Sequence, residues 1–87
     1  MIWQVILKPS AEKDLDGLAH GVRRRIVQRL GGLEANARPV GCVKLASAHA
    51  TYRLRVGDYR IVYEVDDARQ VVYVTIIAHR REVYRGL

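Results

Sequence analysis

The sequence has a single cysteine, two prolines and no phenylalanine among its 87 residues. The lone cysteine, Cys42, excludes an internal disulfide and favours a reducing compartment. It has no histidine or cysteine at metal-ligand spacing, so we interpret it as a small hydrophobe rather than a reactive thiol. We expect neither a metal nor a cofactor.

Long hydrophobic runs are absent as well. No apolar stretch approaches the roughly 18 residues that a membrane span needs. The first residues, Met1 to Leu7, lack the basic lead and the cleavage site of a signal peptide. We therefore expect a cytoplasmic protein with no membrane partner.

Acidic residues are fewer than basic residues. Nine Asp and Glu stand against fifteen Lys and Arg, which gives a net charge of +6. This excess favours nucleic acid, an acidic protein or an anionic membrane surface as a partner. The basic residues are spread through periodic segments rather than gathered in a tail, so the charge belongs to the folded body. The length predicts a single domain, residues 1–87, with a modest core.

The apolar periodicity predicts one strand, then two helices, then further strands. Residues 2–7 form a short apolar strand, and Ser10 is the expected N-cap of the first helix. Val22 begins a helical repeat that ends near Asn36. The two helices should form an antiparallel hairpin. The expected fold is α+β: an N-terminal strand, this helical hairpin, and then a mainly antiparallel sheet of three to four strands, with the helices on one face of the sheet.

Gly57-Asp58 separates two runs of β-branched and aromatic residues, which is a signal for a two-residue hairpin loop. If these residues form the loop, Arg55 faces Arg60 and Arg53 faces Val62. Because side chains alternate along a strand, one face of the hairpin is then apolar. This predicted core face consists of Tyr52, Leu54, Val56, Tyr59, Ile61 and Tyr63.

A further strand is predicted at residues 71–78, after a turn at residues 67–70. Pairing Val65 with Val72 extends the alternation into this strand. The core face then receives Val72, Val74 and Ile76. The opposite face receives Tyr73, Thr75, Ile77 and, one step beyond the strand, His79.

Three arginines, Arg53, Arg55 and Arg60, share the face opposite the core. Like charges directly opposite one another destabilise a hairpin, so a strand pair that only had to fold would alternate signs. The face is either a solvated layer of long side chains or a site for a polyanion. Arg23 and Arg24, on the outer side of the second helix, have the same two interpretations: a solvated face, or a surface for RNA or an acidic partner.

More polar residues follow the last strand: His79, Arg80, Arg81 and Tyr84. The sequence has no glycine-rich phosphate loop, no metal cluster and no Ser/His/Asp series. Guanidinium groups can stabilise the charge that develops on phosphoryl oxygens, and RNA supplies its own nucleophile, the 2′-OH. Tyrosine can stack on a base or move a proton. The whole set therefore suits cleavage of an RNA phosphodiester bond.

The segment from Tyr52 to Val65, followed by residues 79–84 (H-R-R-E-V-Y), resembles the RelE branch of the RelE/ParE superfamily of type II toxins. The resemblance implies a metal-independent, ribosome-dependent endoribonuclease that cuts mRNA in the A site and arrests growth. The implied products carry a 2′,3′-cyclic phosphate and a 5′-hydroxyl. The implied partners are a RelB-like antitoxin, the 70S ribosome with mRNA, and operator DNA bound by the toxin–antitoxin complex.

The resemblance also assigns catalytic roles by position. It gives Arg53 and Arg55 the two basic positions that engage the nucleophile and the phosphate. Arg60 matches the family's arginine that neutralises the scissile phosphate. Arg80 matches the arginine that stabilises the phosphate or the leaving group. Tyr84 matches the family's tyrosine that stacks on a base or assists proton transfer.

The chain departs from the best-known members, which have lysines at the positions of Arg53 and Arg55. Arginine does not lose its proton in proteins, so neither residue is a good general base. The base is then Tyr84 or His79, or the arginines act through charge alone. Further contacts with RNA are expected from His79, Arg81, Arg23 and Arg24.

Two other functions compete with RNA cleavage. One is inhibition of DNA gyrase, as the ParE branch of the same superfamily implies. The other is a non-catalytic module that binds an antitoxin or RNA; the arginines in place of lysines leave this alternative open.

Overall fold

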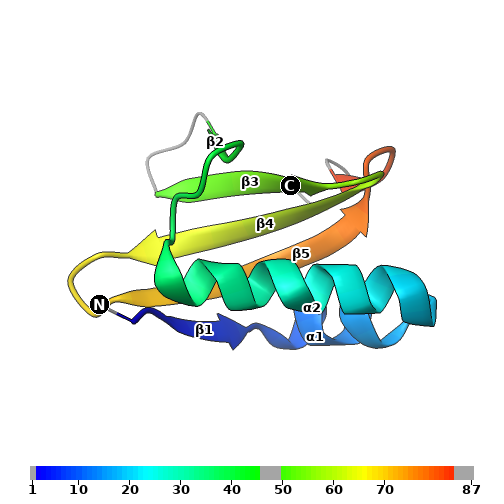
Figure 1. Ribbon diagram of the computed structural model, residues 1–87, viewed down its shortest axis with the longest axis horizontal. Helices are drawn as coiled ribbons and strands as arrows, with labels where there is room; N and C mark the ends of the chain where they lie inside the picture. The colour runs from blue at the N-terminus through cyan, green and yellow to red at the C-terminus, as the bar shows by residue number, and fades with distance from the viewer. Residues whose placement is uncertain (1, 46–49, 84–87) are drawn as a thin grey trace.

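The computed structural model describes residues 2–45 and 50–83 and shows two helices packed on one side of a sheet (Figure 1). The strand order is β1-β5-β4-β3-β2, with β1 parallel to β5 and the other neighbours antiparallel. This arrangement confirms the predicted α+β fold. The elements are β1 Gln4–Leu7, α1 Pro9–Asp16, α2 His20–Ala35, β2 Val43–Lys44, β3 Thr51–Val56, β4 Tyr59–Asp66 and β5 Val71–His79.

The first helix begins two residues earlier than predicted, since its N-cap is Lys8 and not Ser10. Pro9 occupies its first position and Lys8 is the N-cap, because the fixed φ of proline suits the first helical turn. Ser10 is therefore not the cap. Its hydroxyl donates instead to the carbonyl of Thr75 in β5, at 2.8 Å.

The second helix runs without interruption from His20 to Ala35, across Gly31 and Gly32. It buries Ile26, Leu30 and Leu33 on one side, as the helical repeat predicts. A fully buried aliphatic side chain stabilises the fold by about 1.5–3 kcal/mol, enough to offset about 2 kcal/mol for the two glycines. Packing on the sheet therefore keeps this helix intact.

The predicted register of the central hairpin is confirmed. Arg55 pairs with Arg60 and Arg53 with Val62, and β4 and β5 pair at Val65 and Val72. Tyr52, Leu54, Ile61 and Tyr63 are buried in the helix-side core, and Val56 and Tyr59 pack against it.

A β-bulge alters the alternation along β5. The register shifts between Val62, which pairs with Ile76, and Tyr63, which pairs with Val74, so Thr75 is the extra residue on β5. Beyond the bulge, Ile77 pairs with Ile61 and is in the core. The predictions of Ile76 on the core face and Ile77 on the opposite face are wrong for this reason.

The end of β5 extends past its neighbour β1, and α1 covers the exposed edge. The Ser10 hydroxyl bonds the Thr75 carbonyl, and an Asp14 carboxylate oxygen accepts the Ile77 N–H at 3.1 Å. Two side chains of α1 thus replace the missing strand and satisfy backbone groups that would otherwise be unpaired.

The loop after α2 is attached to the other end of the sheet. Arg38 donates to both carboxylate oxygens of Asp67, at 3.0 and 2.8 Å, and to the Tyr52 hydroxyl, at 2.8 Å. The hydrogen bonds from Arg38 lower the pKa of Asp67. The Tyr63 hydroxyl donates to the Ala37 carbonyl at 2.9 Å, and burial raises the pKa of that hydroxyl. Arg38 is therefore a structural residue.

Candidate functional site

Four arginines gather around the β3–β4 turn. Arg53 and Arg55 lie on β3, Arg60 lies opposite Arg55 on β4, and Arg80 follows β5. The pKa of Arg60 is lowered by burial and then by the positive charges of Arg55, Arg53 and Arg80. Since these charges act on one guanidinium, the structure brings the four predicted arginines together; we call them the arginine cluster.

The turn itself holds two of these side chains. Gly57 has a φ of +59°, the left-handed conformation that a two-residue turn needs at its first position. Its carbonyl oxygen accepts hydrogen bonds from Arg55 Nε at 3.3 Å and Arg60 Nη1 at 3.0 Å. Arg60 Nη1 also donates to the carbonyl of Tyr59, at 2.9 Å. Neutral carbonyls fix both guanidinium groups without cancelling their charge.

Arg80 is attached to the same turn. Its backbone N–H donates to the Asp58 carbonyl at 2.7 Å, and its Nε lies 3.9 Å from the Asp58 carboxylate. About half of the Arg80 side chain is exposed (52%), as is 66% of the Asp58 side chain. Arg80 is therefore placed by its backbone, with a loose ion pair at its side chain.

Arg25 also reaches this turn, which the sequence did not predict. A Cβ atom on Gly57 would lie 3.8 Å from Arg25 Nη1. The run of arginines in α2 was visible in the sequence. Only the packing of α2 on the sheet shows which of them approaches the turn.

Arg23 and Arg24 lie elsewhere on α2. Together with His20, Val27 and Gln28 they line a separate hollow of about 360 Å³. None of the four clustered arginines lines this hollow. Any RNA that contacts Arg23 or Arg24 would do so outside the arginine cluster.

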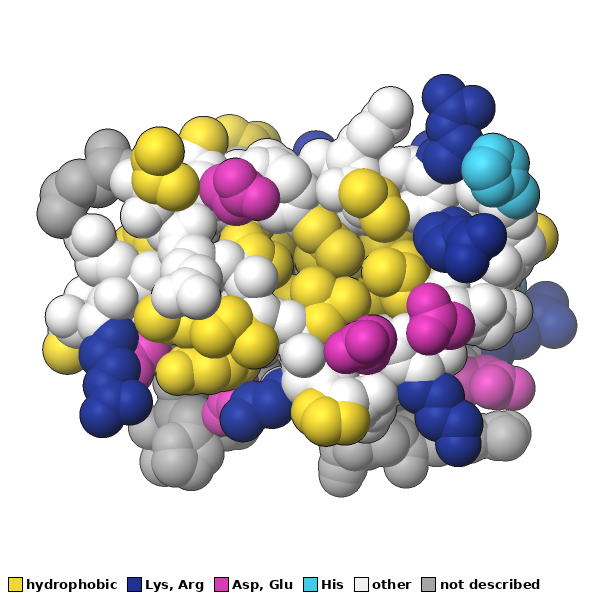
Figure 2. Space-filling view, turned by 90° about the horizontal axis from the view of Figure 1, so that it is seen from below, with side chains coloured by type: hydrophobic (Ala, Val, Ile, Leu, Met, Phe, Trp, Pro, Cys, Tyr) yellow, Lys and Arg dark blue, Asp and Glu magenta, His cyan; other side chains and the backbone are white. Residues whose placement is uncertain are grey.

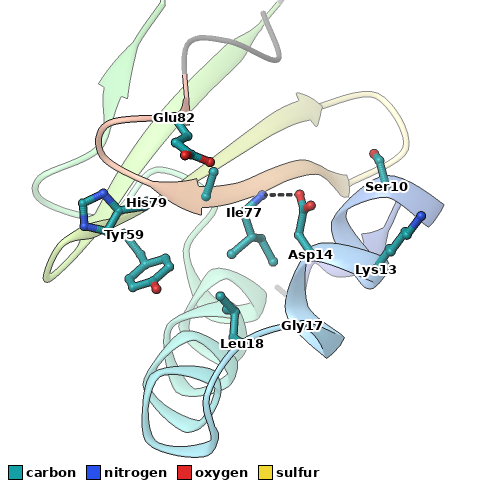
Figure 3. Close-up of a pocket in the computed structure, with 10 residues that line it drawn as sticks. Ser10, Lys13, Asp14, Gly17, Leu18, Tyr59, Ile77, His79 and Glu82 are labelled. Carbon is teal, nitrogen blue, oxygen red and sulfur yellow. Dashed lines mark hydrogen bonds between the residues drawn. The ribbon is translucent and has the colours of Figure 1, made fainter.

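His79 is not on the arginine face, contrary to prediction. It pairs with Tyr59 across the sheet, on the helix side, because the bulge at Thr75 reverses the alternation. The two rings meet edge to face with centroids 5.5 Å apart, at one end of a hollow of about 620 Å³ beside α1 (Figure 3). His79 Nδ1 accepts the N–H of Arg81, an exposed residue.

The predicted catalytic residue Tyr84 lies outside the described residues. Val83, next to it, is 1% exposed although it follows the last strand. The chain is therefore anchored one residue before Tyr84.

The surface beyond the β1 edge is of a different kind. Figure 2 shows apolar side chains gathered at its centre, with charged groups of both signs around them. A hollow of about 350 Å³ between β1, α1 and α2 is lined mainly by aliphatic side chains, including Val5, Leu7, Leu15, Val27 and Leu30. Unlike the arginine cluster, this surface carries charges of both signs around an apolar centre.

Residues 2–45 and 50–83 contain neither a metal-binding cluster nor a membrane-spanning helix. In this part of the chain, no three His, Cys, Asp or Glu side chains are placed to hold a metal ion. Within the same residues, no helix is long and apolar enough to cross a membrane.

The chain is similar to known toxins in sequence and in structure. A family model for the ParE toxin of the type II toxin–antitoxin system, parDE, matches residues 5–84. Toxin RelG of Mycobacterium tuberculosis is 28% identical over 86 residues, which cover 98% of this chain and 99% of RelG.

Two solved structures show the same fold. One is the toxin–antitoxin complex RelBE2 from Mycobacterium tuberculosis, with a TM-score of 0.80, 26% identity, and coverage of 92% of this chain and 100% of that chain. The other is the archaeal RelE–RelB complex from Pyrococcus horikoshii, with a TM-score of 0.79, 25% identity, and coverage of 92% and 97%. Because the family model spans nearly the whole chain and the fold matches RelE structures, the protein belongs to the RelE/ParE superfamily of toxins from type II toxin–antitoxin systems.

Proposed function

We propose that this toxin is a ribosome-dependent endoribonuclease that cuts mRNA in the A site. The observation that supports the proposal is the arginine cluster, in which several guanidinium groups converge on one turn and neutral carbonyls hold two of them. Cleavage of a phosphodiester bond concentrates negative charge on the phosphoryl oxygens. Preorganised donors that need no rearrangement during the reaction stabilise this charge most effectively.

In the proposed reaction, the 2′-OH of the substrate attacks the adjacent phosphorus and the 5′-oxygen leaves. Arg60 neutralises the phosphate, while Arg53 and Arg55 orient the phosphate and the nucleophile from the neighbouring strand. Arg80 stabilises the charge on the leaving oxygen. The products are a 2′,3′-cyclic phosphate and a 5′-hydroxyl.

The proton of the 2′-OH needs an acceptor other than the arginines. Arginine stays protonated, so Arg53 and Arg55 act through charge. His79 lies with Tyr59 on the helix side of the sheet. We therefore assign transfer of this proton to Tyr84 rather than to His79; if Tyr84 instead stacks on a base, water accepts the proton. The leaving 5′-oxygen takes up a proton from water to give the 5′-hydroxyl. Arg23, Arg24 and Arg81 act as additional contacts to RNA.

The proposed partners follow from charge and from the related structures. An acidic, RelB-like antitoxin complements a surface of net charge +6, and the related toxins above were solved as complexes with antitoxins. The other partners are the 70S ribosome with mRNA, and operator DNA for the toxin–antitoxin complex. These partners place the action of the toxin in the cytoplasm.

A second candidate is inhibition of DNA gyrase, which the match to the ParE family model favours. The two candidates leave different lesions: cut mRNA on ribosomes, or gyrase trapped on DNA. The gathering of four arginines at one turn favours RNA cleavage.

The test is to map mRNA ends after the purified toxin is mixed with ribosomes programmed with a defined message. The expected result is a cut within the A-site codon that requires the ribosome and disappears when that codon carries a 2′-deoxy nucleotide at the cut position. A cut in the deoxy message would overturn the 2′-OH mechanism. An intact message together with trapped gyrase would favour the second candidate.

A further inference from the structure

Asp58 is an acidic residue placed among cations. It occupies the second position of the β3–β4 turn, between Arg55 and Arg60 in the hairpin and against Arg80 after β5. Any carboxylate at this position repels the polyanion that the cluster is suited to bind. A residue needed only for the turn could be asparagine, which suits hairpin loops equally well. The charge of Asp58 therefore calls for an explanation.

The contact between Asp58 and Arg80 has two separable parts. The backbone bond, from the Arg80 N–H to the Asp58 carbonyl at 2.7 Å, fixes the chain of Arg80. The side-chain contact is looser, with Arg80 Nε 3.9 Å from Asp58 Oδ1. Loss of the carboxylate would leave the backbone bond in place, so Arg80 would remain at the turn.

The ion pair between the side chains of Asp58 and Arg80 is weak enough for another anion to replace the carboxylate. Both side chains are more than half exposed (52% and 66%), and exposed ion pairs contribute only about 0.2–1 kcal/mol. A phosphate offers a guanidinium two parallel, charge-assisted hydrogen bonds at shorter distance. An incoming phosphate can therefore replace the carboxylate as the partner of Arg80.

We propose that Asp58 is a positioning residue whose carboxylate occupies, in the free toxin, the place that an RNA phosphate takes beside Arg80. The carboxylate keeps the Arg80 guanidinium near Arg60 and weakens the binding of any RNA strand that does not displace it. The charge of Asp58 also acts on Arg60, whose pKa it raises against the stronger lowering effects. This inference rests on the proposed RNA-cleaving function, because it assumes that the ligand of the cluster is an RNA phosphate.

The test measures binding separately from cleavage. The probe is a fluorescent single-stranded RNA of about 12 nucleotides with 2′-O-methyl groups throughout, which cannot be cut and is long enough for one binding site. Fluorescence anisotropy compares the wild type with Asp58→Asn and with a matched control, Asp16→Asn. Asp16 is an exposed acid at the end of α1, so both variants gain the same net charge.

The expected result is that Asp58→Asn binds the probe about three- to fivefold more tightly than wild type, since that range corresponds to loss of a weak ion pair. Asp16→Asn should show a smaller gain. Binding by Asp58→Asn that is no tighter than that of Asp16→Asn would overturn the proposal.

Arg80 provides the second arm of the test. In an Arg80→Ala background, Asp58→Asn should tighten binding no more than Asp16→Asn does, because the cation that the carboxylate occupies is gone. A gain that still exceeds that of Asp16→Asn without Arg80 would contradict the pairing. Asp58→Ser serves as a second neutral variant, with folding checked by thermal melting. Failure of the wild type to cut an unmodified message on ribosomes would count against the proposed function and leave the binding result standing.

Discussion

Arg60 is fixed by hydrogen bonds within the protein and still has N–H donors for a ligand. Its Nη1 donates to the carbonyls of Gly57 and Tyr59. Because guanidinium has five N–H donors, others remain for a phosphate. Lysine, a flexible point charge, could not be held in this orientation. The pattern of the sequence predicted the face of this residue correctly, since Gly57-Asp58 fixes the register of the hairpin.

Tyr63 makes a hydrogen bond that stabilises the fold away from the arginine cluster, and its contribution to stability can be measured. Its hydroxyl donates to the Ala37 carbonyl, and the side chain is fully buried. Tyr63→Phe leaves a carbonyl without its partner and should lower the free energy of unfolding by about 1–3 kcal/mol in urea denaturation. Tyr73→Phe is the matched control, because Tyr73 is half-exposed. Equal losses in the two variants would show that the Ala37 contact contributes nothing.

At the scale of elements, the bulge at Thr75 marks the limit of prediction from the sequence. The pairing of Val65 with Val72 is correct, and alternation places Val72 and Val74 in the core. Thr75 is an ordinary strand residue, so nothing local marks it as the extra one. The bulge depends on packing between strands that are distant in sequence. For this reason His79 was assigned to the wrong face of the sheet.

The role of α1 in closing the edge of β5 can be tested through Asp14. Asp14→Ala removes the acceptor of the Ile77 N–H and should destabilise the protein by about 1–3 kcal/mol. Asp16→Ala, in the same helix but exposed, should change stability by less than about 0.5 kcal/mol. Hydrogen exchange of the Ile77 amide should accelerate in the first variant only. Unchanged exchange at Ile77 would mean that Asp14 does not cap the edge.

At the scale of the molecule, the packed core and the arginine cluster lie in different parts of the fold. The helices and the core occupy one side of the sheet, and Arg38 with Asp67 fixes the end opposite the β3–β4 turn. Positive charge predominates at that turn, which brings together arginines from three strand ends. The sequence predicted Arg53, Arg55 and Arg60 as one group because they belong to one hairpin. The place of Arg80 and Arg25 depended on tertiary packing.

The measurement that tests the central claim most directly is the single-turnover rate of mRNA cleavage on programmed ribosomes, for Arg60→Ala and Arg69→Ala. Arg69 is an exposed arginine in the turn at the other end of β4, so the two variants lose the same charge. We expect the rate to fall about 100-fold or more for Arg60→Ala, as for the loss of one preorganised donor. Arg69→Ala should cleave at the wild-type rate. Equal rates for the two folded variants would show that the arginine cluster is not the active site.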